Sequence, residues 1–111
     1  MTNRELVQHF YDEVFNAQNA QAAEKYLAEG YIQHNPGVAG GRKGFIDTFT
    51  ETFKKGFHFL DIQHIISEDN FVCVHLFARN RETNAVTAWV SDIYRVENGL
   101  LAEHWDCIQR M

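Results

Sequence analysis

The spacing of hydrophobic residues changes near residue 57 of the chain. Before this point apolar residues recur at intervals of three and four, which is the pattern of one face of a helix. After it apolar and polar residues alternate, which is the pattern of strands with one buried face. Helices followed by strands are typical of an α+β fold in which each layer buries its apolar face against the other. We therefore expect one domain over residues 1–111, with three N-terminal helices packed on a strongly curved, four-stranded antiparallel sheet.

The three helices are predicted from local signals. Thr2 and Glu5 have the spacing of a capping box, so the first helix is expected to begin there. Good helix formers over residues 20–28 predict a second, shorter helix that ends at Gly30. Phenylalanines at four-residue steps predict a third helix over residues 43–55.

Composition excludes several classes of partner. The net charge is −5 and no basic run exceeds two residues, so neither nucleic acid nor an anionic membrane is an expected partner. No apolar run approaches the roughly 20 residues that span a bilayer. The two cysteines, Cys73 and Cys107, have no metal-ligand spacing, and we expect free thiols in a cytoplasmic protein. Aromatic residues make up 14% of the chain, enough to line a cavity as well as to fill a core.

An ionisable residue interrupts an apolar row in the third predicted strand. Alternation places Asp92 on the same face as Val90 and Tyr94. A two-residue turn at residues 83–84 would pair His75 with Asp92 across the neighbouring strand. The sequence therefore predicts a histidine beside a carboxylate among apolar side chains.

The last hairpin allows two registers. A two-residue turn at residues 98–99 places Trp105 on the face of Asp92, whereas a three-residue loop with a bulge places His104 and Asp106 there. We favour Trp105, because it belongs to the more apolar set, and keep His104 and Asp106 as alternatives.

A carboxylate and an imidazole in an aromatic pocket can abstract a proton next to a carbonyl group and protonate an enolate. His34 lies in a predicted loop over residues 31–37 and could reach the rim of that pocket. No histidine pair has the spacing of a zinc-binding helix, and no serine or cysteine lies in a nucleophile motif. We expect no metal and no cofactor.

These residues resemble the SnoaL-like polyketide cyclases, a branch of the superfamily of nuclear-transport-factor-like and ketosteroid-isomerase-like folds, and most of all its aldol-condensation-catalysing branch. The resemblance rests on the segments Tyr31–Pro36, Val74–His75, Val90–Gly99 and Glu103–Gln109, and covers essentially the whole chain. It implies a cone-shaped pocket between sheet and helices, a homodimer, and acid/base catalysis without metal or cofactor. Asp92 matches the family's acid/base, and His75 is the nearest match to its assisting histidine.

The resemblance and the strand pattern together give a candidate site for a small hydrophobic carbonyl compound. The expected catalytic residues are Asp92, His75 and His34, and the expected substrate-binding residues are Tyr31, Asn35, Phe49, Trp105 and His104. Aldol condensation, cyclisation and isomerisation are the expected reactions, with hydrolysis or dehydration in the same pocket as another option. The alternative is a ligand-binding or dimerisation module of the same fold that performs no chemistry.

Overall fold

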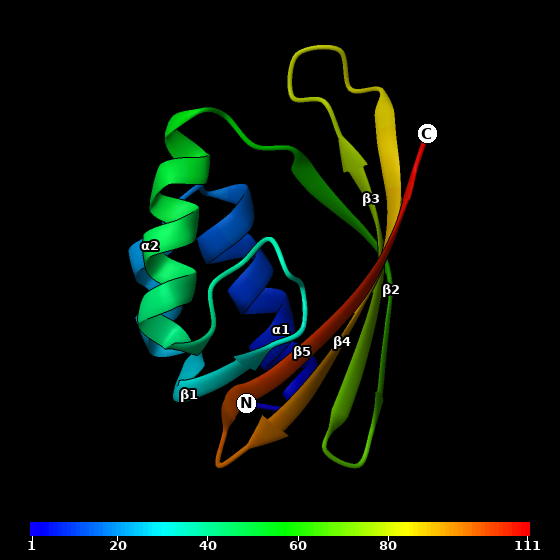
Figure 1. Cartoon of the computed structure of the whole chain (residues 1–111). Helices are drawn as coiled ribbons and strands as arrows, with labels where there is room; N and C mark the ends of the chain where they lie inside the picture. Colours follow the sequence, from blue (N-terminus) through cyan, green and yellow to red (C-terminus); the bar gives the residue numbers. More distant parts are fainter.

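The computed structural model describes residues 1–111 and has the expected α+β architecture. The helices lie together on one side of a single twisted sheet (Figure 1). The sheet has five strands in the order β1-β5-β4-β3-β2. None of the helical segments has the length and hydrophobicity that a membrane-spanning helix requires.

The helical layer consists of four segments. Helix α1 (Asn3–Phe10) begins with the predicted capping box and continues directly into the wider π-helical segment η1 (Tyr11–Asn16). A 3₁₀ helix, η2 (Ala20–Lys25), follows. Helix α2 (Gly41–Lys54) matches the predicted third helix.

The four predicted strands are present as an antiparallel meander. They are β2 (Phe59–Glu68), β3 (Phe71–Arg79), β4 (Val86–Glu97) and β5 (Leu100–Arg110). The fifth strand, β1 (Leu27–Gln33), runs parallel to β5 at the edge of the sheet.

The prediction of a helix over residues 20–28 is wrong for its last three residues. The helical turn ends at Lys25, and Gly30 lies inside β1 rather than at a helix terminus. Short helices have little stability of their own, so tertiary pairing determines this segment. The pairing with β5 joins residues about 70 positions apart in the chain, as in Gln33 with His104, and local sequence carries no sign of it.

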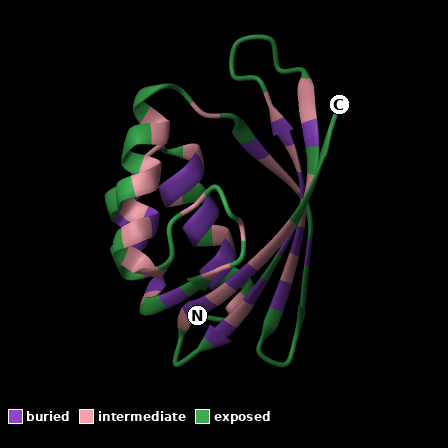
Figure 2. Cartoon of the chain, in the orientation of Figure 1, coloured by how far each residue is buried: buried purple, intermediate pink, exposed green.

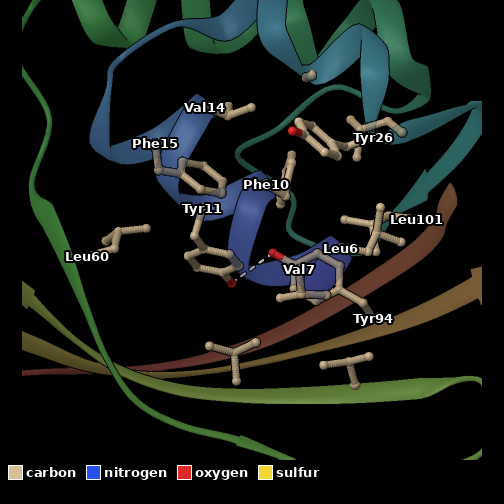
Figure 3. Packing of buried hydrophobic residues seen from close by; sticks show 14 of the residues in the cluster. Leu6, Val7, Phe10, Tyr11, Val14, Phe15, Tyr26, Leu60, Tyr94 and Leu101 are labelled. Carbon is tan, nitrogen blue, oxygen red and sulfur yellow. Dashed lines mark hydrogen bonds between the residues drawn. The ribbon is translucent and has the colours of Figure 1, made fainter. Parts of the chain in front are cut away.

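The core fills the space between the helices and the inner face of the sheet (Figure 2). Phe10 lies at its centre and contacts aromatic rings of the helical layer and of β4. Figure 3 shows Tyr11 pointing from the helical layer towards Tyr94 on the sheet, joined by a hydrogen bond between their hydroxyl groups. Polar groups therefore penetrate the core at this point.

The predicted register between β3 and β4 is wrong by one residue. His75 pairs with Ser91, and Val74 is the residue opposite Asp92. The connection is longer than a two-residue turn, because the Asn80 side chain accepts hydrogen bonds from the backbone of Glu82 and Thr83 and closes a wider loop. A one-residue shift exchanges the two faces of a strand, so His75 lies on the outer face.

The hairpin between β4 and β5 combines features of both predicted alternatives. Asn98 and Gly99 have positive φ angles of 53° and 75° and form a two-residue turn, as the first alternative requires. A bulge follows, in which Ala102 is inserted between the partners of Val96 and Arg95. The bulge turns His104 and Asp106 to the inner face, so the preference for an inward Trp105 is wrong.

The outer face of the sheet carries large apolar side chains that no element of the chain covers. Trp89 and Ile93 are 44% and 40% exposed, and Phe71 and Ile66 are exposed on the same face. A monomer rarely leaves so many large apolar side chains together in water.

We expect two chains to associate through this outer face. Trp89→Lys places a charge in the middle of the apolar surface and should convert a dimer into a monomer, as measured by sedimentation equilibrium at tens of micromolar. Thr50→Lys adds the same charge on the exposed side of α2 and should leave the mass unchanged. A monomeric mass for the unmodified chain would contradict the prediction.

Candidate functional site

A cavity of about 320 Å³ opens between α2 and the inner face of the sheet. Its walls are mainly apolar and include Phe15, Phe45, Phe49, Phe57, Leu60, Leu76, Val90 and Ile108. Its polar lining comes chiefly from β1, β4, β5 and the loop after β1. A largely apolar pocket with a few convergent polar groups is typical of small-molecule sites.

Asp92 and His104 form a buried pair at the inner end of this cavity. Apart from the tyrosines, they are the only polar or charged residues among the 26 buried residues of the chain. Asp92 Oδ1 lies 2.9 Å from His104 Nε2. Because β4 and β5 are adjacent in the sheet, the rigid ladder holds both side chains on one face.

Gln33 determines which nitrogen of His104 carries a proton. The backbone N–H of Asn35 donates to Gln33 Oε1 at 3.1 Å, and His104 Nδ1 lies 2.6 Å from the same oxygen. An amide oxygen only accepts hydrogen bonds, so Nδ1 of His104 must be the donor. Nε2 is then free to be either an acceptor or, in the imidazolium form, a second donor.

The contact between Asp92 and His104 therefore holds one proton. If His104 is neutral, Nε2 bears a lone pair and the proton must be on Asp92 Oδ1; if His104 is charged, Nε2–H donates to an ionised carboxylate. Without a proton, two lone pairs would face each other at 2.9 Å. The pair can both release and accept a proton, which is the property an acid/base catalyst needs.

A chain of phenols supports the second oxygen of Asp92. Tyr11 donates a hydrogen bond to Asp92 Oδ2, and the hydroxyl groups of Tyr11 and Tyr94 are 2.9 Å apart. Burial, followed by the nearby charge of Asp92, raises the pKa of both phenols well above 10. Both tyrosines thus remain proton donors at neutral pH, and Tyr94 donates to Tyr11.

A second carboxylate, Asp106, borders the same pocket. Its Oδ2 accepts a hydrogen bond of 2.8 Å from Asn35 Nδ2 and lies 3.9 Å from His104 Nε2. Tyr31 closes this part of the cavity, and burial together with Asp92 and Asp106 raises its pKa well above 10. The inner end of the pocket therefore combines two carboxylates with neutral hydrogen-bond donors.

Five of the eight site residues expected from the sequence line this cavity: Asp92, Tyr31, Asn35, Phe49 and His104. The other three lie outside it. His75 is on the outer face, where its Nδ1 lies 3.1 Å from Nδ1 of His64.

His34 and Trp105 also point away from the pocket. Their rings stack with centroids 5.1 Å apart, and His34 Nε2 lies 2.7 Å from Glu103. Side-chain hydrogen bonds from His34 and Arg95 lower the pKa of Glu103. Alternation along β1 explains the placement, because Gln33 faces the pocket and its neighbour His34 faces outwards.

Sequence reasoning missed Tyr11, Tyr94 and Gln33 as members of the site. Tyr11 has the helical spacing of an ordinary core residue, and only its hydroxyl group indicated a possible place in the site. Gln33 lies next to His34 in the chain, and its role follows only from the β1–β5 pairing.

Asp92, His104 and Asp106 could also offer ligands to a cation. One donor atom of each lies within 4.8 Å of the others, and two carboxylates with an imidazole suit several transition metals. Each residue nevertheless has a hydrogen-bonding partner within the protein: Tyr11 for Asp92, Gln33 for His104 and Asn35 for Asp106.

We therefore expect the fold to be independent of metal. Because internal hydrogen bonds already satisfy these groups, EDTA should leave the melting temperature unchanged within about 1 °C. Scanning calorimetry with and without chelator measures this. A fall of several degrees in EDTA, reversed by added Zn²⁺ or Mn²⁺, would mean that the three residues hold a structural cation.

The buried phenols also predict how stability depends on alkaline pH. The pKa values of Tyr11, Tyr31 and Tyr94 are raised in the folded chain, so folding binds their protons more tightly than the unfolded chain does. Their contribution to the free energy of unfolding is complete below about pH 10 and is lost as the pH rises further. Urea unfolding at about pH 8 and pH 11 should show this fall, with the phenolate absorbance of these three residues at 295 nm appearing only as the chain unfolds. Tyr94→Phe should reduce the pH dependence by about one proton; an unchanged slope would contradict the assignment.

Comparison with known proteins places this geometry in a family. The sequence model described as SnoaL-like polyketide cyclase matches residues 5–111. No curated protein is significantly similar in sequence.

Solved structures share the fold at low sequence identity. An NTF2-like protein of unknown function from Cytophaga hutchinsonii is 21% identical, with a TM-score of 0.79 over 98% of this chain and 91% of that one. IdmH, a proposed polyketide cyclase from Streptomyces antibioticus, is 18% identical, with a TM-score of 0.75 over 97% and 93%. TsrD from Streptomyces laurentii is 20% identical, with a TM-score of 0.72 over 95% and 86%. These likenesses establish the nuclear-transport-factor-like fold, and the match over residues 5–111 goes further: the chain belongs to the SnoaL-like polyketide cyclase family.

Proposed function

We propose that this protein catalyses proton transfer at the carbon next to a carbonyl group of a small, largely hydrophobic compound. This step is shared by aldol condensation, cyclisation and isomerisation. The observation that carries the proposal is the Asp92–His104 pair, which shares one proton at the end of an apolar cavity. Membership of a family named for polyketide cyclases supports the same chemistry.

In this proposal Asp92 is the base. With the shared proton on His104, the Asp92 carboxylate accepts a proton from the carbon, and the C–H electron pair moves towards the carbonyl oxygen to give an enolate. The pair then carries two protons. One returns to the product, either at the alkoxide oxygen of an aldol or at another carbon in an isomerisation.

The surroundings favour this transfer in two ways. Tyr11 and His104 donate to the two carboxylate oxygens of Asp92 and fix its orientation, so the base needs no reorganisation during the reaction. Phe45, Phe49 and Phe57 keep water from the reacting carbon and lower the local dielectric constant. Asn35 and Tyr31 supply hydrogen-bond donors at this end of the cavity that can hold the carbonyl oxygen as charge develops on it.

Asp92→Asn should remove activity and preserve the fold. The Asn oxygen can accept a hydrogen bond from Tyr11. Its NH₂ group can donate to Nε2 of neutral His104, which is unprotonated because Gln33 holds the ring proton at Nδ1. We expect the free energy of unfolding to change by less than about 1 kcal/mol, since no buried group loses its partner. The rate of α-proton exchange should fall by about 10²- to 10⁴-fold.

Exchange of the α-protons of 2-tetralone in D₂O, followed by NMR, measures this step without knowledge of the natural substrate. His75→Asn makes the same kind of change on the outer face and should leave the rate unaltered. An Asp92→Asn variant that exchanges at the original rate would contradict the proposal. Binding of 2-tetralone without exchange by the unmodified protein would favour a ligand-binding module instead.

A further inference from the structure

Arg110 differs from the other five arginines of the chain. Arg42, Arg79 and Arg95 form salt bridges with carboxylates, and Arg4 and Arg81 donate to backbone carbonyl groups. Arg110 alone has neither an ion pair nor a side-chain hydrogen bond, although a guanidinium group has five donors. It is also the only arginine or lysine that lines the cavity.

The backbone holds Arg110 at a defined place. It pairs with Ala88 in the β4–β5 ladder, and the next residue, Met111, donates its backbone N–H to Thr87. Asp92 and Asp106 form another pair of the same ladder, four residues further along each strand. Four residues correspond to about 13 Å of strand, so the cavity runs from two carboxylates at one end to an unpartnered cation at the other.

The difference in charge between the two ends limits how a charged ligand can lie in the cavity. The two carboxylates near His104 would repel an anionic group, whereas a guanidinium group binds a carboxylate through two parallel hydrogen bonds. The apolar walls between the two ends suit a hydrocarbon body, and a volume of about 320 Å³ lies at the small end of the range for ligand pockets.

We propose that Arg110 forms an anion-binding subsite at the mouth of the cavity and that the ligand is a carboxylate-bearing compound with one or two rings. The carboxylate binds to Arg110, and the apolar body extends inwards towards Asp92. If the proposed function is correct, this orientation presents the far end of the ligand to the acid/base pair; the subsite itself rests only on the charges and shape of the cavity.

A matched pair of ligands that cannot react tests the subsite. Isothermal titration calorimetry should show that the protein binds 2-naphthoate more tightly than 2-naphthamide, which has the same shape without the charge. Arg110→Gln should weaken binding of 2-naphthoate by about tenfold and leave binding of 2-naphthamide unchanged. Arg110→Lys, which keeps the charge and loses the paired geometry, should retain part of the preference.

A control variant distinguishes a direct contact with Arg110 from a long-range effect of the net charge of the protein. Lys43→Gln removes one positive charge at the exposed start of α2, away from the cavity, and should not alter either affinity. Equal weakening of both ligands by Arg110→Gln, or no preference for 2-naphthoate in the unmodified protein, would overturn the proposal. The outcome is independent of catalysis, because 2-tetralone carries no charge and its exchange tests Asp92 without engaging Arg110.

Discussion

The bulge at Ala102 determines which chemistry faces the pocket. With a regular ladder after the Asn98–Gly99 turn, alternation would place Trp105 and Cys107 on the inner face. The inserted residue reverses the remainder of β5, so His104 lies beside Asp92 and Asp106 follows two residues later. The acid/base pair, the second carboxylate and the inward position of Arg110 all depend on this one irregularity.

The parallel pairing of β1 with β5 completes the site that the bulge begins. It brings Gln33 beside His104 and fixes the ring nitrogen that carries a proton, and it positions Asn35 to donate to Asp106. Tyr11 reaches Asp92 from the helical layer, at the junction of α1 and η1. The edge strand, the central strands and the helical layer each contribute hydrogen-bonding groups to this cluster. Because these groups satisfy one another, so polar a cluster is tolerated in the core.

Helices and strands could be predicted from the sequence because their hydrophobic periods are local. Which residues of β3 face the core could not be predicted, because Val72 and Val74 are as apolar as their neighbours Phe71 and Cys73, and the pattern fits either register. The one sequence signal for the correct register was Asn80, since an asparagine that accepts from two backbone N–H groups closes a wider loop.

In β5 the signal was the run Leu100–Ala102, whose consecutive apolar residues interrupt the alternation where the bulge occurs. Gln33 had no such signal, because its partner lies 71 residues away.

The number of protons at the inner end of the cavity also explains why the two ends of the cavity differ in charge. When Asp106 is ionised, Asp92 and His104 share one acidic proton between them, so the three groups carry a net charge of about −1 that no lysine or arginine offsets nearby. Phenol and amide donors from Tyr11 and Asn35 stabilise that charge without cancelling it. A neutral carbonyl compound can approach such a cluster, whereas a ligand group that already carries a negative charge is repelled, so the charges favour an anionic part at the other end, where Arg110 is the only arginine or lysine that lines the cavity.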